Sequence, residues 1–271
     1  MQRKELHYKQ SLVSYLRFGA GPLTALCFHG YGEQASHFTF LEQGAGNQYT
    51  FIAVDLPLHG LTQWHEDLVI TPAQAMDMVE QIMQQEGLAL NNITLMGYSM
   101  GGRVSLSLFE YKPQVFRKMV LLAPDGLKMN GWYWLATQTW AGNRFFRFTM
   151  KHPSWFFGLL KILGKLKLVN TSIFKFVNYY IGNTEVRTQL YQRWTAFRKL
   201  KPCLKKIRKQ IKAQSTPVEL LYGKFDRIIL PSVGEKFRNG IEDYCRISII
   251  RSGHLLLHEN HLPEILPRLL P

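Results

Sequence analysis

Short, continuous runs of apolar residues recur along the chain and alternate with segments of helical periodicity. The runs lie at residues 23–28, 51–54, 93–96, 119–123, 218–222 and 247–250, after two β-rich stretches near residues 6–10 and 12–18. Helical patterns occupy residues 72–85, 100–111 and 262–270. Strands that helices cover on both faces are apolar throughout, and their alternation with helices favours a parallel sheet. The pattern therefore predicts an α/β fold with a doubly wound, mostly parallel sheet.

One long segment interrupts this alternation. Residues 126–212 contain several helical stretches and no clear strand, and the earlier pattern resumes near residue 216. We therefore expect a core built from residues 1–125 and 213–271, with a helical cap, residues 126–212, inserted into it. Because ligands of such sheets bind beyond the carboxyl ends of the strands, the residues that follow the apolar runs are candidates for a functional site.

The sequence GYSMG at residues 97–101 fits the pattern G-x-S-x-G and lies between an apolar run and a helical segment. This context predicts a sharp strand-to-helix turn that exposes Ser99, with glycines relieving the crowding. The serine then sits at a helix N-terminus, where free N–H groups and the helix dipole favour negative charge. Ser99 is the candidate nucleophile; the alternative is a structural glycine-rich turn.

A serine hydroxyl is a weak nucleophile that needs a neighbouring base. His254 follows the last apolar run and is the candidate base, while the competing His258 and His261 lie further along, in a predicted helix. His29 lies at a strand end. We expect it to shape the substrate site through hydrogen bonds.

The base needs a carboxylate to orient it and to stabilise its charged form. Asp226 follows an apolar run and gives the order serine, aspartate, histidine along the chain, although Asp125 also follows a run and remains an alternative. An oxyanion intermediate needs two N–H donors. We expect these from Met100, directly after the nucleophile, and from Tyr31, in the loop after residues 23–28.

Five segments in order resemble the motif series of the α/β-hydrolase superfamily. They are residues 29–32 (HGYG), 55–60 (DLPLHG), 97–102 (GYSMGG), 223–226 (GKFD) and 252–254 (SGH). The resemblance covers about residues 20–125 and 214–271, and it departs at Leu58, where the family usually has a small residue. It implies an α/β-hydrolase fold and a serine triad that acts on a small-molecule acyl substrate, with no cofactor and no metal.

Two further functions remain open beside an ester or thioester hydrolase. Residues 97–103 (GYSMGGR) also resemble the nucleophile region of the menaquinone-pathway lyase, which implies a carbon–carbon hydrolase or lyase whose Arg103 binds a substrate carboxylate. The alternative for Arg103 is an ion pair on the helix that follows the nucleophile. A binding protein without catalytic activity on the same fold is the third possibility.

The positive charge of the chain is concentrated in the expected cap. The formal net charge is +14, and residues 126–212 hold 18 of the 33 Lys and Arg residues but one acidic residue, Glu185. They also hold 17 of the 35 aromatic residues. Within them, Trp155, Leu159, Ile162, Leu163 and Leu166 share a face at helical spacing, with Lys161 and Lys165 opposite.

Three explanations of this charged, aromatic segment stay open. The apolar face packs on the core, or it contacts an anionic membrane surface, or the charge attracts a soluble anionic substrate such as an acyl-coenzyme A. Nucleic acid is not expected as a partner, because the basic residues alternate with bulky apolar ones and no nucleic-acid module is recognisable.

The first residues of the chain, the lengths of its apolar runs and its cysteines indicate in which cellular compartment to expect the protein. The first ten residues are polar, without the apolar stretch of a signal peptide. No run is long enough to span a membrane, and the three cysteines, Cys27, Cys203 and Cys245, form neither a disulfide framework nor a zinc pattern. We expect a cytoplasmic protein, with peripheral membrane contact if the cap provides it. No oligomeric state is predicted.

Overall fold

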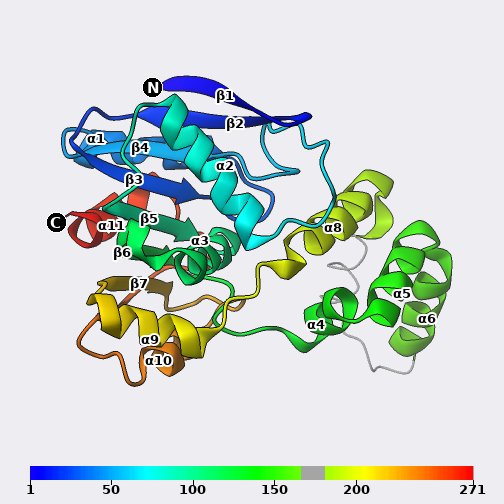
Figure 1. Ribbon diagram of the computed structural model, residues 1–271. Coiled ribbons are helices and arrows are strands. Elements are labelled where there is room, and N and C mark those ends of the chain that lie inside the picture. The colour runs from blue at the N-terminus through cyan, green and yellow to red at the C-terminus, as the bar shows by residue number, and fades with distance from the viewer. Residues whose placement is uncertain (166–180, 271) are drawn as a thin grey trace. The chain divides into compact units, whose positions relative to one another are not determined.

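The computed structural model describes residues 1–165 and 181–270, and its strands form one eight-stranded sheet (Figure 1). The strand order is β1-β2-β4-β3-β5-β6-β7-β8. The strands from β4 onward in this order pair in parallel, whereas β1 and β2 pair antiparallel at one edge. Their bounds are β1 Gln2–Tyr8, β2 Ser11–Phe18, β3 Leu23–Phe28, β4 Tyr49–Val54, β5 Ile93–Tyr98, β6 Phe116–Leu122, β7 Val218–Gly223 and β8 Cys245–Ile250. The predicted doubly wound, mostly parallel sheet is confirmed.

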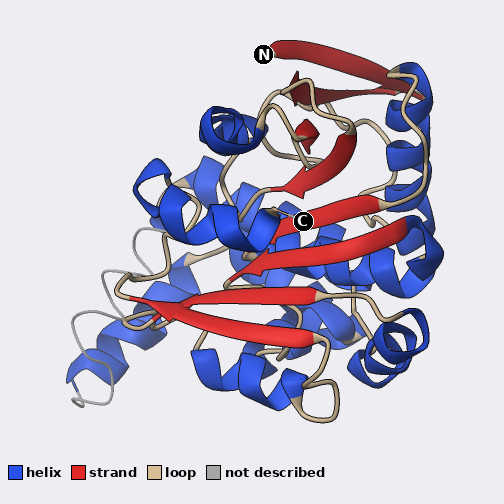
Figure 2. Cartoon of the chain, turned by 90° about the vertical axis from the view of Figure 1, so that its left-hand side faces the viewer, coloured by secondary structure: helices blue, strands red, loops and turns tan. Residues whose placement is uncertain are grey.

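Helices flank this sheet, as Figure 2 shows. Helices α2 (Pro72–Gln85), α3 (Met100–Tyr111) and α9 (Leu204–Gln214) form a contiguous row, and α1 (Glu42–Ala45) contacts α11 (Leu262–Leu269). Helix α10 (Pro231–Arg238) packs against β7 and β8. Every residue of β4 and β5 is buried, which explains why these strands are apolar on both faces.

Local sequence signals fix the helix that precedes β5. Thr71 caps α2: its side chain accepts a hydrogen bond from the Gln74 backbone, and the Gln74 side chain accepts one from the Thr71 N–H. Pro72 occupies the first helical position, where its missing N–H costs nothing. This reciprocal pair satisfies two backbone donors that a helix start would otherwise leave open, so α2 begins at the residue that the pattern predicts.

The chain divides into two compact units at positions that differ from those expected. The first unit contains Met1–Glu66, Thr71–Lys128 and Leu200–Pro271, and the second contains Asp67–Ile70 and Met129–Lys199. Residues 200–212 therefore belong to the core unit, not to the expected cap of residues 126–212. The reason is that α9 buries Ile207 and Ile211 and packs against α3. Because α9 is rich in lysine, the sequence pattern had grouped this helix with the basic segment that precedes it.

The second unit is helical in its described part. It contains α4 (Gly131–Gln138), α5 (Trp140–Lys151), α6 (Ser154–Lys165) and α8 (Thr184–Ala196). Aromatic rings join these helices, since Trp194 lies 5.1 Å from Tyr133 and 5.5 Å from Phe146 between ring centroids. The short segment 67–70 joins this unit through a hydrogen bond from the Ile70 N–H to the Ala196 carbonyl, at 2.9 Å. None of the helices in the described part of the chain is long and apolar enough to cross a membrane.

Candidate active site

The turn between β5 and α3 holds Ser99 in an unusual backbone conformation. Its φ is 48° and its ψ is −114°, a region that residues other than glycine rarely occupy. The turn is tight, because a Cβ atom at Gly101 would lie 1.8 Å from the Phe28 carbonyl oxygen. The Ser99 N–H donates to the Leu122 carbonyl at 2.9 Å, and the Ser99 carbonyl accepts from the Asp125 N–H at 2.8 Å. Hydrogen bonds to β6 and its following loop therefore hold the strained turn.

Two neighbouring strands carry the other two candidate residues. Strands β7 and β8 pair in parallel up to Gly223 and Ile250, and their following loops stay together through a 2.9 Å hydrogen bond from the Phe225 N–H to the Ser252 carbonyl. Asp226 and His254 lie just beyond these points. The parallel sheet thus carries side chains that are 28 residues apart in sequence to one place.

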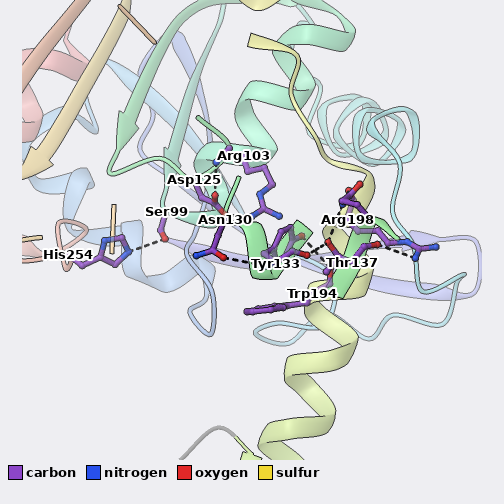
Figure 3. A network of polar contacts seen from close by, with 11 residues as sticks. Ser99, Arg103, Asp125, Asn130, Tyr133, Thr137, Trp194, Arg198 and His254 are labelled. Atoms are coloured by element: carbon purple, nitrogen blue, oxygen red, sulfur yellow. Dashed lines mark hydrogen bonds and ion pairs between the residues drawn. The ribbon is translucent and has the colours of Figure 1, made fainter. Parts of the chain in front are cut away.

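Hydrogen bonds link Asp226, His254 and Ser99 in a continuous chain. His254 Nδ1 lies 2.7 Å from Asp226 Oδ2, and His254 Nε2 lies 3.0 Å from Ser99 Oγ, a contact that Figure 3 shows. A carboxylate accepts hydrogen bonds, so Nδ1 carries the proton and Nε2 presents its lone pair to the serine hydroxyl. This geometry places a base within reach of the Ser99 proton.

The Asp226 carboxylate is buried and held by the backbone as well. Its Oδ1 accepts hydrogen bonds from the N–H groups of Ile228 at 2.7 Å and Ile229 at 3.0 Å. The Asp226 side chain has no exposed surface, whereas a fifth of the His254 side chain is exposed. The carboxylate therefore has a fixed orientation, and the imidazole is open on one side.

The competing residues have other partners. His258 Nδ1 accepts from the Asn260 N–H at 3.2 Å, and His261 Nε2 lies 3.1 Å from Ser252 Oγ. Asp125 forms an ion pair with Arg103, and its second oxygen accepts from the Gly126 N–H at 2.6 Å. None of these three contacts is part of the hydrogen-bonded series that joins Asp226, His254 and Ser99.

Arg103 lies on α3, and its guanidinium group faces a carboxylate of the protein itself. Figure 3 shows the ion pair between Arg103 and Asp125 separately from the contact of Ser99 with His254. Both side chains are largely shielded from solvent, with 12% and 28% of their surfaces exposed. This is the ion pair on the helix after the nucleophile that was the alternative to binding a substrate carboxylate.

The two expected oxyanion donors lie at one edge of the sheet. Met100 is the first residue of α3, where the backbone N–H has no partner within the helix. Tyr31 is three residues past Phe28, the last residue of β3, and Phe28 pairs with Gly97 of the neighbouring β5. Both N–H groups therefore come from backbone just beyond the carboxyl ends of adjacent strands.

His29 is fully buried and contacts the backbone of two loops. Its Nε2 accepts from the Leu56 N–H at 3.0 Å, so Nδ1 carries the proton and donates to the Gly30 carbonyl at 2.8 Å. The ring therefore ties the loop after β4 to the loop after β3, where Tyr31 lies. These hydrogen bonds of His29 hold the loop that carries Tyr31, and its place in the substrate site stays a prediction.

Sequence reasoning missed two residues beside His254. The Tyr98 hydroxyl donates to the His254 carbonyl at 3.1 Å, and the two rings lie 5.5 Å apart. Glu33 Oε2 accepts from the Gly30 N–H at 3.2 Å and lies 3.7 Å from His37 Nδ1. Burial raises the pKa of Glu33, although hydrogen bonding to Gly30 and the charges of His37 and His254 oppose this. Burial and the charges of Glu33 and Asp226 raise the pKa of Tyr98.

Glu33 directly follows the segment HGYG, and Tyr98 occupies a position of G-x-S-x-G at which the pattern specifies no residue type. Glu33 reaches the site because the loop after β3 folds back on Gly30, and Tyr98 is one of many apolar residues in a buried strand.

For metal ions, residues 1–165 and 181–270 contain no group of three or more His, Cys, Asp or Glu side chains that could hold one.

Comparison with known proteins places these observations in a family. A family model described as alpha/beta hydrolase fold matches residues 26–261. An uncharacterized hydrolase, YugF of Bacillus subtilis, is 26% identical over 262 residues, which cover 91% of this chain and 88% of that protein. Esterase Rv0045c of Mycobacterium tuberculosis is 28% identical over 110 residues, or 41% of this chain and 36% of that protein.

Solved structures show the same fold at low sequence identity. A thermophilic esterase from Thermogutta terrifontis has a TM-score of 0.66 at 20% identity, over 97% of this chain and 94% of that one. A thioesterase domain from the curacin biosynthetic pathway has a TM-score of 0.64 at 15% identity, over 100% and 99% of the two chains.

Proposed function

Since the chain belongs to the alpha/beta hydrolase fold family, we propose that it is a serine hydrolase that cleaves an ester or thioester bond through Ser99, His254 and Asp226. The observation that carries this proposal is the continuous chain of hydrogen bonds, 2.7 Å from Asp226 to His254 and 3.0 Å from His254 to Ser99. Nucleophile and base lie within hydrogen-bonding distance, and a third group orients the base, which is the arrangement that covalent catalysis requires.

The proposed reaction begins with attack of Ser99 Oγ on the carbonyl carbon of the substrate. His254 Nε2 takes the hydroxyl proton as the new C–O bond forms, and the carbonyl π electrons move onto the oxygen. The resulting oxyanion accepts hydrogen bonds from the N–H groups of Met100 and Tyr31. When it collapses, the bond to the leaving group breaks, and His254 returns the proton to the departing alcohol or thiol.

A water molecule completes the cycle. His254 Nε2 removes a proton from the water as it attacks the acyl-enzyme, and the second tetrahedral intermediate expels Ser99, which takes the proton back. Asp226 remains ionised and stabilises the imidazolium form in both halves. Loss of one oxyanion donor typically costs about 3 kcal/mol of transition-state stabilisation, so the backbone geometry around Met100 and Tyr31 matters as much as the side chains.

The ion pair of Arg103 is the observation that favours ester or thioester cleavage over the lyase alternative. The similar structures include proteins named as an esterase, a thioesterase domain and a meta-cleavage product hydrolase, and these names are compatible with ester, thioester and carbon–carbon bond cleavage alike. The lyase alternative needs Arg103 to bind a substrate carboxylate, whereas its guanidinium already pairs with Asp125. We propose an apolar or amphiphilic acyl substrate, which the dependence of turnover on acyl chain length tests.

Turnover of a series of p-nitrophenyl esters and one acyl-coenzyme A thioester tests the proposal. We expect activity in the natural protein and a loss on the order of a million-fold in kcat for Ser99→Ala. Ser107→Ala is a matched control on the same helix, because Ser107 is buried and its hydroxyl has no hydrogen-bond partner within the described residues. Unchanged turnover in Ser99→Ala, or no turnover of any ester or thioester by the natural protein, contradicts the proposal.

A further inference from the structure

Helices α5 and α6 present large apolar side chains to solvent. On α6, Trp155, Leu159 and Ile162 follow one another at helical spacing, and all three are exposed, with 58% of Ile162 accessible. The sequence had placed them on one apolar face together with Leu163 and Leu166. The side chain of Leu163 and the whole of Leu166 lie outside the described residues. Leu160, the residue after Leu159, is buried.

The exposed residues of the two helices form one continuous face. The rings of Phe145 on α5 and Trp155 on α6 lie 5.2 Å apart between centroids. Phe148 is exposed beside Phe145 on the same helix, with 51% and 57% of the two residues accessible. We call Phe145, Phe148, Trp155, Leu159 and Ile162 the α5–α6 face. Contiguous apolar patches of this kind are uncommon on soluble monomers and mark interaction sites.

Cationic side chains border this face. Trp140, Arg144, Arg147 and Lys151 repeat along α5 at spacings of four, three and four, and all four are exposed. The Arg144 guanidinium lies over the Trp140 ring, 5.5 Å from its centroid. Lys161 is exposed on α6. The sequence from residue 126 to residue 184 contains eight Lys and Arg residues and no Asp or Glu.

From this arrangement we propose that the α5–α6 face docks onto an anionic lipid bilayer. The face combines exposed apolar side chains, which would enter the boundary between headgroups and acyl chains, with a row of cations that would meet lipid phosphates. Tryptophan, like tyrosine, is enriched at that boundary. An anionic bilayer presents negative charge over a wide area, which suits a face that has cations at its border and no acidic group.

The contact is interfacial, because α5 and α6 have 12 residues each, well short of the roughly 20 that span a bilayer. It requires no catalytic chemistry and is independent of the proposed function. A Ser99→Ala variant is therefore expected to bind vesicles as the natural protein does, which separates a failure of this proposal from a failure of the hydrolase proposal.

Co-sedimentation of the whole chain with vesicles tests the docking. We expect binding to vesicles of phosphatidylcholine mixed with phosphatidylglycerol, weak binding to phosphatidylcholine alone, and release by salt. Each Lys or Arg near an anionic surface contributes about 1 kcal/mol, so the triple variant Arg144→Gln, Arg147→Gln, Lys151→Gln is expected to bind about a hundred-fold more weakly. The triple variant Trp155→Ser, Leu159→Ser, Ile162→Ser is expected to lose binding even at low salt, where the natural protein binds.

A matched control removes three exposed charges elsewhere. Lys201, Lys205 and Lys209 are exposed in the core unit, and their replacement by Gln lowers the net charge by the same amount. Docking through the α5–α6 face predicts little change in this control, with circular dichroism confirming that every variant is folded. Equal losses in the two charge variants mean that net charge alone drives binding, and overturn the proposal.

Two other outcomes also overturn it. The first is equal recovery of the natural protein in the supernatants of anionic and neutral vesicles. The second is a dimer in solution that the apolar triple variant abolishes while no vesicle binds, which assigns the face to a second copy of the chain.

Discussion

Replacement of Asp226 by asparagine is the sharpest test of the site, because the two carboxylate oxygens have different partners. Oδ1 accepts from two backbone N–H groups, those of Ile228 and Ile229, while Oδ2 faces His254 Nδ1. An asparagine keeps both backbone hydrogen bonds only if its amide oxygen takes the Oδ1 position. Its NH2 group then points at His254.

That orientation fixes the wrong tautomer of the base. A ring nitrogen that faces an NH2 donor must accept, so Nδ1 loses its proton and Nε2 carries it. Nε2 then has no lone pair for the Ser99 proton at 3.0 Å. The analogous substitution in another serine triad lowers kcat by about 10⁴, which corresponds to about 5.5 kcal/mol in the activation free energy. The opposite amide orientation would leave two buried N–H groups facing a donor, at a cost of about 1–3 kcal/mol each.

Steady-state hydrolysis of the best p-nitrophenyl ester measures this loss, with circular dichroism as the test of folding. Asp125→Asn is the matched control, because Asp125 meets Arg103 and Gly126 but not His254. We expect Asp226→Asn to lose about 10⁴ in kcat and Asp125→Asn to lose less than about tenfold. The reverse result, with Asp125→Asn inactive and Asp226→Asn active, would refute the assignment of the acid.

Three further predictions address how the core supports the site. In Glu86, burial opposes ionisation, but hydrogen bonds from two basic side chains and a tyrosine outweigh it and lower the pKa. Glu86→Gln should therefore reduce the free energy of unfolding in urea by about 3 kcal/mol at neutral pH, and the difference should be lost only as the pH falls through this lowered pKa. Burial raises the pKa of Glu33, so its ionised form destabilises the fold at neutral pH. Glu33→Gln should stabilise the protein by about 1 kcal/mol there, an effect that fades below about pH 4, and should lower kcat/KM, because a negative charge near His254 favours its imidazolium form. Gly101→Val should lower both the thermal midpoint and the activity, since its Cβ would lie 1.8 Å from the Phe28 carbonyl oxygen.

The sheet and the candidate nucleophile were predictable because short-range signals encode them. The apolar run of residues 93–96 and the glycines at 97 and 101 mark a buried strand and a crowded turn, and α3 begins at Met100 as predicted. Asp226 and His254 could be selected because parallel strands end at one edge of a sheet, so chain order and strand ends already imply proximity.

Other contacts depend on how loops fold back, and no pattern in the sequence carries that information. The buried ring of His29 meets the Leu56 and Gly30 backbones, although a histidine at a strand end is equally compatible with substrate binding. Glu33 reaches the surroundings of His254 through its loop. The boundary after residue 199 was also not predicted. The many lysines of α9 suggested a continuation of the basic segment, whereas two buried isoleucines of this helix pack within the core unit.

Helical periodicity shows which residues share a face, but not whether another element covers that face. On α6 the spacing of Trp155, Leu159 and Ile162 is as typical of a packed helix as of an exposed one, and the structure leaves all three accessible while it buries Leu160. The difference lies in the neighbours, since α5 turns Thr149 and Met150 inward and Phe145 and Phe148 outward. Because apolar contacts are not directional, the same pattern is compatible with a core or with a lipid surface. The tight turn at Ser99, by contrast, needs glycines at defined positions, and these can be recognised in the sequence. The motifs of this chain predict its candidate catalytic residues, whereas the partner of the α5–α6 face has to be found by measuring what it binds.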